Sequence, residues 1–249
     1  MNNTNPKPSH KERTLLLVCI VFLAGFLLVT FLRPNFHSTD ITVNLWIPSI
    51  QSSALTFLAE GIALIFDTTS LVVFSLIIAA GLFLKNYKAQ GLLLLGAMGG
   101  DALLVSIIKT LDHIARPANG LLFDTGFSYP SGHSAGVVVF LGVLAYFALR
   151  HWQSRRSKAL IGVGMGVLVG VVGFDRLYLN VHWLSDVFGG WLFGIFWLLV
   201  AVLVFRRLEM AGKFGSERFG KVANLLFVGA VVVSVFLIVL GLVGNVLPS

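Results

Sequence analysis

The sequence has little charge and almost no cysteine. Asp, Glu, Lys and Arg make up 12% of the 249 residues, and only one residue is cysteine. Soluble domains carry about 25% charged residues. A single cysteine excludes a disulfide within the chain and a metal site built from cysteines. Hydrophobic residues make up 57% of the chain, and the mean hydropathy is +0.90. This composition predicts a protein solvated mostly by lipid.

No polar block divides the apolar sequence, which predicts one all-α domain, a bundle of membrane helices. Seven apolar runs are visible: 15–32, 68–84, 89–108, 135–149, 159–174, 187–205 and 225–243. Several are shorter than the ~20 residues of a perpendicular span, so we expect the polar residues at their ends to continue the helices. The first run is too long for the apolar core of a signal peptide, and no cleavage site follows it. We therefore expect it to be retained as the first helix.

The lysines and arginines fall mainly in alternate connecting segments. Residues 1–14, 85–88, 150–158 and 206–221 hold 14 of the 18. Because basic residues concentrate on the cytoplasmic side, this pattern predicts a cytoplasmic N-terminus. The segments 109–134 and 174–186 then lie on the non-cytoplasmic side. The net charge of +7 is better explained by contact with anionic membrane lipids than by nucleic acid, since no basic stripe with interleaved aromatics is present.

The sequence also predicts how the chain is divided into segments. Residues 1–13 are polar, hold two prolines and are expected to be a disordered cytoplasmic N-terminus. We expect residues 14–206 to form the membrane domain, and 207–249 to add a cytoplasmic loop and a seventh, C-terminal transmembrane helix. The alternative is that one of the shorter runs does not span, but the loop charges favour seven. Between the first two runs, residues 40–66 mix apolar and polar side chains. They predict either short amphipathic helices near the outer interface or a packed loop.

Most of the polar chemistry lies between Lys109 and Asp186, in three clusters. The clusters hold Lys109 and Arg116; Ser131, Gly132 and His133; and Arg176, His182 and Asp186. Together they supply cations, imidazoles, a carboxylate and a helix start, which are the groups that hold and attack a phosphoryl group.

The spacing within the clusters suggests how they act. His182 and Asp186 are four residues apart, so on a helix they share one face. A hydrogen bond from His182 to Asp186 fixes the tautomer and leaves the other ring nitrogen free to attack phosphorus. Ser131 is the expected N-cap of a helix whose first turn, at Gly132, offers backbone N–H groups to an anion. His133, beside that anion site, is placed to protonate a leaving oxygen.

Lys109 and Arg116 have an alternative explanation, because basic side chains often extend to the membrane interface without a catalytic role. Lys109, Arg116 and Arg176 nevertheless lie on the side that should be poor in basic residues. This location favours binding of phosphoryl oxygens, for which arginine offers two parallel hydrogen bonds.

These residues resemble the signature motifs of the type 2 phosphatidic acid phosphatase superfamily, lipid phosphate phosphatases that share a core with vanadium-dependent haloperoxidases. The family pattern is Lys-x6-Arg-Pro, then Pro-Ser-Gly-His, then Ser-Arg-x5-His-x3-Asp. The first two are matched in full, and the third is matched from Arg176 onward. Asp175 stands where the family usually has serine, which bears on substrate fit more than on chemistry.

The resemblance implies a six-helix phosphatase core, to which the seventh helix is appended, and a role for each motif residue. His182 is the nucleophile that forms a phosphohistidine, Asp186 orients it, and His133 is the general acid. The implied phosphate binders are Lys109, Arg116, Ser131, Gly132 and Arg176. No metal or cofactor is expected, since no cluster of carboxylates accompanies the motifs.

The leading hypothesis is therefore an integral membrane lipid phosphatase whose substrate is a lipid phosphate of the undecaprenyl diphosphate, phosphatidylglycerophosphate or phosphatidic acid class. A lipid phosphotransferase that uses the same phosphohistidine is a second hypothesis. A non-catalytic lipid-phosphate transporter is a third, and the pairing of His182 with Asp186 counts against it. The roles of Asp101 and His113, and the oligomeric state, stay open.

Overall fold

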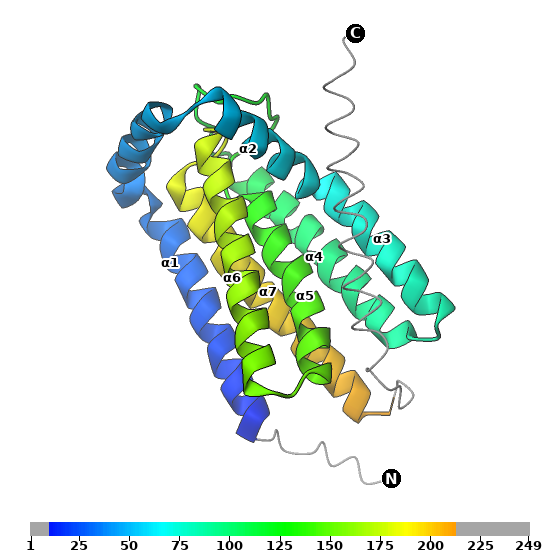
Figure 1. Ribbon diagram of the computed structural model, residues 1–249. Helices are drawn as coiled ribbons and strands as arrows, with labels where there is room; N and C mark the ends of the chain where they lie inside the picture. Colours follow the sequence, from blue (N-terminus) through cyan, green and yellow to red (C-terminus); the bar gives the residue numbers. More distant parts are fainter. Residues whose placement is uncertain (1–9, 213–249) are drawn as a thin grey trace.

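The computed structural model describes residues 10–212, and within this range the chain is helical and has no strand (Figure 1). Seven α-helices and one short 3-10 helix follow one another. Their bounds are α1 His10–Trp46, η1 Ile47–Ile50, α2 Ser53–Ile65, α3 Thr68–Leu84, α4 Lys88–Asp112, α5 Gly132–His151, α6 Arg155–Tyr178 and α7 Leu184–Met210. The predicted all-α class is confirmed.

The long helices form an antiparallel bundle. In Figure 1, α1, α4 and α6 run in one direction and α3, α5 and α7 run in the other, while α2 crosses one end of the bundle. Helix α5 contacts α3, α4, α6 and α7, and α7 contacts α1, α4, α5 and α6. These two helices are therefore the centre of the fold. The long connection 113–131 and the short connection 179–183 meet at the end that α2 crosses.

The predicted spans agree with the helices. Within residues 10–212, five helices (α1, α4, α5, α6 and α7) are long and apolar enough to cross a membrane. Helices α2 and α3 are bent by 47° relative to each other and give a sixth span if they are counted as one. Apart from α3, which coincides with the run 68–84, these helices extend beyond the apolar runs at both ends, as expected. Lys109, Arg176 and Asp186 therefore lie within helix termini. The seventh run, 225–243, lies outside the described residues.

Two segments differ from the prediction in detail. Residues 40–46 belong to α1, which is much longer than the run 15–32. The separate short helices of the segment 40–66 are η1 and α2. Ser52 caps α2 by accepting a hydrogen bond from the Leu55 amide at 3.4 Å. Of the N-terminal segment 1–13, residues 10–13 are helical and the others lie outside the described part of the chain.

The side of α1 that faces α7 follows a seven-residue repeat. The inward-facing residues are Glu12, Cys19, Phe26, Arg33 and Asp40. All are buried except Arg33, whose side chain is 11% exposed. The two helices are antiparallel, so later residues of α1 contact earlier residues of α7. Phe26 packs on Phe193, with ring centroids 5.4 Å apart, and Arg33 contacts Asp186. A heptad spacing of this kind keeps one stripe of a long helix on its neighbour.

Helices α5 and α7 approach each other closely at two glycines of α7. A Cβ atom at Gly190 would lie 2.6 Å from the Ser131 carbonyl oxygen, and one at Gly194 would lie 2.8 Å from the Ala135 carbonyl oxygen. Small residues at such positions let helices pack in lipid, where the hydrophobic effect gives no driving force between helices. This close contact fixes the start of α5 against the start of α7.

Replacing Gly194 with alanine is expected to destabilise the protein by about 1–3 kcal/mol, the usual cost of inserting a methyl group into a close-packed contact. The matched control is Gly164→Ala on α6, where a Cβ meets nothing within 4 Å. Thermal unfolding of the detergent-solubilised protein measures both variants. Equal midpoints for the two variants would contradict the close contact.

Candidate active site

The three polar clusters come together at the end of the bundle that holds the connections 113–131 and 179–183. Lys109 comes from the end of α4, His133 from the start of α5, and Asp186 from the start of α7. The two connections are joined by hydrogen bonds. The Leu121 amide donates to the Leu179 carbonyl oxygen at 2.8 Å, and the Trp183 indole donates to the Ala115 carbonyl oxygen at 2.8 Å.

A cavity of about 350 Å³ lies among these elements. Five of the eight predicted site residues line it: Lys109, Arg116, Gly132, His133 and His182. Asp67, Thr68 and Asp124 contribute further polar atoms to its wall. Ser131, Arg176 and Asp186 are buried behind the lining residues. The cavity wall therefore holds two cations and two imidazoles together with two carboxylates.

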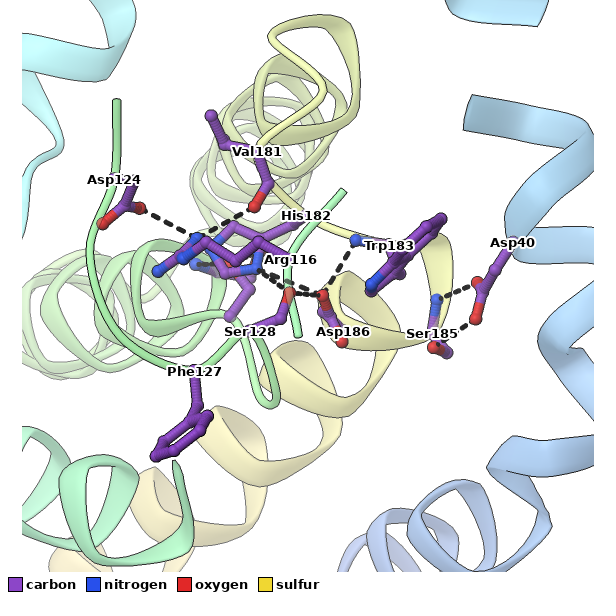
Figure 2. Close-up of polar contacts among 12 residues, drawn as sticks. Asp40, Arg116, Asp124, Phe127, Ser128, Val181, His182, Trp183, Ser185 and Asp186 are labelled. Carbon is purple, nitrogen blue, oxygen red and sulfur yellow. Dashed lines mark hydrogen bonds and ion pairs between the residues drawn. The ribbon is translucent and has the colours of Figure 1, made fainter. Parts of the chain in front are cut away.

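His182 and Asp186 contact each other, but not as two residues of one helix. Helix α7 begins at Leu184, so His182 lies in the connection before it. The reason is a capping box, in which a side chain near the helix start binds the backbone of the N-cap residue. Asp186 Oδ2 accepts the Trp183 amide at 2.8 Å and lies 3.3 Å from His182 Nδ1. Figure 2 shows this carboxylate between Ser128, Trp183 and His182.

The partners of the His182 ring define its tautomer. Nε2 lies 3.1 Å from Arg116 Nη1, and a guanidinium can only donate a hydrogen bond. Nε2 is therefore the acceptor, and the ring proton is on Nδ1, where it is donated toward Asp186. The lone pair of Nε2 is therefore directed to Arg116, which lines the cavity.

Burial keeps this ring neutral. His182 is 3% exposed, and its burial lowers its pKa to about 4, although Asp186 beside it opposes the change. A charged imidazolium is disfavoured in such a place because it loses its hydration. At neutral pH, His182 therefore offers an unprotonated nitrogen.

Lys109 and Arg116 hold the connection 113–131 while they line the cavity. Lys109 Nζ donates to the carbonyl oxygens of Phe127, at 2.6 Å, and Ser128, at 3.1 Å. Arg116 donates to the carbonyl oxygen of Val181 at 2.8 Å and forms an ion pair with Asp124 at 2.9 Å (Figure 2). Burial lowers the pKa of Arg116 from its ordinary value, and Asp124 opposes this. The guanidinium stays charged, since arginine does not lose its proton in proteins.

The start of α5 has the geometry that the sequence predicted. Ser131 is the N-cap and accepts a hydrogen bond from the Ser134 amide at 3.3 Å, and the helix begins at Gly132. The Ser131 amide is already bound to the Asp186 carbonyl oxygen at 3.0 Å. Amides of the first helical turn have no partner inside the helix, so those of Gly132 and His133 are the ones directed to an anion in the cavity.

His133 has an acidic neighbour. Its Nε2 lies 3.5 Å from Asp67 Oδ1. Asp67 is the N-cap of α3, and its other oxygen accepts the Thr69 amide at 2.8 Å. The carboxylate is therefore fixed, and it is placed to orient the imidazole at the cavity wall.

Comparisons with known proteins establish the family of the chain. The family model of the PAP2 superfamily matches residues 90–210. Phosphatidylglycerophosphatase B of Bacillus subtilis is 31% identical over 178 residues, which are 70% of this chain and 88% of that protein. The chain belongs to the PAP2 superfamily. The predicted family is confirmed.

Two further comparisons extend the match. A crystal structure of a transmembrane PAP2-type phosphatidylglycerolphosphate phosphatase from Bacillus subtilis superimposes with a TM-score of 0.67 at 26% identity, over 84% of this chain and all of that one. An undecaprenyl-diphosphatase of Sulfolobus acidocaldarius is 36% identical over 70 residues, 28% of this chain and 30% of that protein. The chain is thus an integral membrane protein with the fold of PAP2 membrane phosphatases.

One motif residue of the PAP2 pattern is less accessible than predicted. Arg176 is 2% exposed, and its guanidinium binds the carboxylate of the adjacent Asp175, with Nε 3.0 Å from Oδ2. Asp175 is the residue that replaces the usual serine, so the departure from the PAP2 pattern supplies Arg176 with an internal counter-ion. In this conformation Arg176 lies behind the cavity wall instead of in it.

The two residues left open by the sequence lie outside the cavity lining. His113 is the C-cap of α4, in a left-handed conformation with φ of 52°, and its ring packs against Phe127 at 4.4 Å. Asp101 is buried in the middle of α4 and faces Gly136 of α5.

Among the residues outside the predicted set that contact site residues, Ser128, Arg33 and Asp67 lie beside the two histidines or Asp186. The Ser128 hydroxyl donates to Asp186 Oδ2, and nothing in the sequence marked it. Asp67 precedes an apolar run at Thr68, which is the pattern of an N-cap, but it gave no sign of a contact with His133. Arg33 was the one basic residue that belonged neither to the motifs nor to the cytoplasmic segments. That unexplained charge, together with the seven-residue spacing on α1, was the sequence signal that could have indicated a contact of Arg33 with the site.

The neutral state of His182 leads to a pH prediction. Between pH 7.5 and 5, its ring ¹⁵N resonances should stay those of a neutral tautomer with the proton on Nδ1, because burial lowers the pKa of His182 to about 4. ¹⁵N-histidine NMR in detergent measures this, with His182→Gln for assignment. Protonation with a midpoint near the ordinary ~6.5 would contradict burial as the controlling effect.

The lowered pKa of His182 also makes the free energy of unfolding depend on pH. The unfolded chain takes up a proton at this histidine near pH 6.5, whereas the folded protein does so only near pH 4. The contribution of His182 to the free energy of unfolding is therefore complete above pH 6.5 and is lost as the pH falls toward 4.

Proposed function

We propose that this protein is a membrane lipid phosphate phosphatase, which hydrolyses a phosphomonoester or diphosphate lipid through a phosphohistidine. The observation that carries the proposal is the environment of His182. Its Nδ1 faces the Asp186 carboxylate at 3.3 Å, while its Nε2 carries a lone pair on the cavity side, next to the guanidinium of Arg116. A neutral, oriented imidazole beside fixed positive charge is what nucleophilic attack on a phosphoryl group requires.

The proposed reaction has two steps. When Arg116 turns its Nη1 donor from His182 to a phosphoryl oxygen, the Nε2 lone pair is free and attacks phosphorus in line. The bond from phosphorus to the leaving oxygen breaks, and His133 transfers a proton to that oxygen. Asp186 holds the Nδ1 proton and stabilises the positive charge that develops on the ring. In the second step His133 takes a proton from water, the water oxygen attacks phosphorus, and the phosphorus–nitrogen bond breaks to release inorganic phosphate.

The proposed phosphate binders are Lys109, Arg116, Ser131, Gly132 and Arg176. Lys109, Arg116 and the first-turn amides at Gly132 line the cavity and supply direct electrostatic stabilisation. Ser131 acts by capping α5, and Arg176 adds its charge once its guanidinium leaves Asp175. This charge takes the place that a divalent cation has in other phosphoryl-transfer sites, so we propose that the reaction needs no metal or cofactor.

The substrate class follows from the relatives. One relative is named a phosphatidylglycerophosphatase and another an undecaprenyl-diphosphatase. Both names describe lipid phosphates, so phosphatidylglycerophosphate, undecaprenyl diphosphate and the simpler phosphatidic acid are the candidates. Release of free phosphate separates hydrolysis from transfer to another lipid, the alternative use of the same intermediate.

We also propose an orientation in the cell membrane. The basic segments at 85–88 and 150–158 lie at the end of the bundle opposite the cavity, together with the start of α1 (Figure 1). The positive-inside rule assigns that end to the cytoplasm and the active site to the non-cytoplasmic face. The proposed organisation is a cytoplasmic N-terminus of residues 1–13, a membrane phosphatase domain of residues 14–206, and a cytoplasmic loop with a further transmembrane helix in residues 207–249.

Purified protein in detergent with excess EDTA is expected to release phosphate from at least one of the three lipids. His182→Ala is expected to abolish release, because no other group replaces the nucleophile. The matched control is His151→Ala, which removes a histidine at the opposite end of α5 and should leave the rate unchanged.

Each result has a separate meaning in this assay. Loss of release with EDTA in the wild type, restored by Mg²⁺, would overturn the metal-independent mechanism. Full release by His182→Ala would overturn the assignment of the nucleophile. Phosphate lost from the lipid but recovered on a second lipid would favour transfer.

Cysteine labelling tests the orientation. Phe123, which is 96% exposed in the connection 113–131, and Gln153, between α5 and α6, are replaced separately with cysteine. A membrane-impermeant maleimide added to intact cells should label Phe123→Cys, and should label Gln153→Cys only after the membrane is opened. The native Cys19 is buried, so wild-type protein gives the background. The reverse pattern would invert the topology.

A further inference from the structure

We propose that Arg33 is a positioning residue, which holds the Asp186 carboxylate in the orientation that aligns His182. The inference rests on the proposed function, because it gives Arg33 a role in that reaction. Arg33 lies on α1, outside residues 90–210 that the PAP2 family model matches, and belongs to none of the three motifs.

The contact is close and sheltered. Arg33 Nη2 donates to Asp186 Oδ1 at 2.8 Å, and Arg33 Nε donates to the Ser185 hydroxyl at 3.1 Å. The guanidinium also lies over the Tyr129 ring, 4.9 Å from its centroid. Asp186 is fully buried, and the Arg33 side chain is 11% exposed. A charge-assisted hydrogen bond in such surroundings is stronger than one at the surface.

The two carboxylate oxygens of Asp186 contact different partners. Oδ2 accepts from Ser128 and Trp183 and lies against His182, whereas Oδ1 is held by Arg33. A carboxylate with one oxygen bound on each side cannot rotate without breaking one set of bonds. Removing Arg33 would leave Oδ1 buried beside no cation, and the carboxylate would then turn or take up a proton. Either change weakens its hold on the Nδ1 proton of His182.

Asp40 extends this support. Its Oδ1 accepts the Ser185 amide at 2.9 Å, and its Oδ2 accepts the Ser185 hydroxyl proton at 2.7 Å (Figure 2). The Ser185 oxygen is then left with lone pairs for Arg33 Nε. Asp40 and Arg33 are seven residues apart on the inward side of α1, so both act on the first turn of α7 from one helix.

Arg33 is not placed to bind the phosphoryl group. It does not line the 350 Å³ cavity that contains Lys109 and Arg116. It lines a separate cavity of about 760 Å³ between α1, Ile114 and Trp183. Its action on the reaction therefore passes through Asp186.

The test compares Arg33→Gln and Arg33→Lys with the wild type in the phosphate-release assay. Arg33→Gln should lower kcat by roughly 10- to 100-fold, as loss of an outer orienting partner does elsewhere, with KM changed by less than about threefold. Arg33→Lys, which keeps the charge, should recover part of the rate. The control is Arg207→Gln, which removes the Arg207–Glu12 ion pair, 3.9 Å long, at the other end of the same two helices. It should leave kcat unchanged.

A double-mutant cycle separates positioning from general stability. In an Asp186→Asn background, Arg33→Gln should change kcat by less than about twofold, since the residue through which it acts is already altered. If the fold-losses in kcat of Arg33→Gln and Asp186→Asn multiply in the double variant, the inference is overturned. An unchanged kcat in Arg33→Gln alone would also overturn it.

A readout that needs no activity distinguishes failure of this inference from failure of the proposed function. The ¹⁵N resonance of His182 Nδ1 in Arg33→Gln should move toward its value in Asp186→Asn. A resonance identical to that of the wild type would overturn the inference even if no lipid is hydrolysed. Should Arg33→Gln fail to fold, Arg33→Lys carries the same measurement.

Discussion

A single buried carboxylate draws the separate parts of the fold together. Asp186 is fully buried, and a charge in such a place is tolerated only when hydrogen bonds and an opposite charge compensate it. Its four partners come from three segments: Arg33 from α1, Ser128 from the long connection, and Trp183 and His182 from the connection just before α7. The position of α1, the fold of the long connection and the start of α7 therefore depend on this one group.

The cations of the cavity have a similar double role. Lys109 and Arg116 bind main-chain carbonyl oxygens of the two connections, and they also line the cavity. Carbonyl oxygens satisfy these donors before an anion arrives, which lowers the cost of holding positive charge there. A phosphoryl group then competes with carbonyls that are already in the protein, so the site is preorganised for charge that develops during the reaction.

The sequence predicted the parts of this arrangement that depend on local pattern. Apolar runs located the helices, and the order and spacing of the motifs indicated His133 and His182 as site residues. What it missed depends on contacts between segments. The capping box placed His182 before α7, because Asp186 binds the backbone of Trp183, and a spacing of four residues does not distinguish this from a shared helical face. The sequence showed that Asp175 departs from the family pattern. It did not show that Asp175 is the buried counter-ion of Arg176.

Arg33 shows why motifs alone could not predict the role of the N-terminal helix. Lipid gives α1 no hydrophobic reason to prefer one register on α7, since every register exposes apolar side chains to apolar solvent. The heptad stripe fixes which side of α1 faces α7 but allows slips of seven residues, each of which would set Phe26 or Asp40 against Asp186. Only the observed register pairs the buried carboxylate with a cation. The contact that orients the proposed nucleophile is thus also the one that fixes the position of α1.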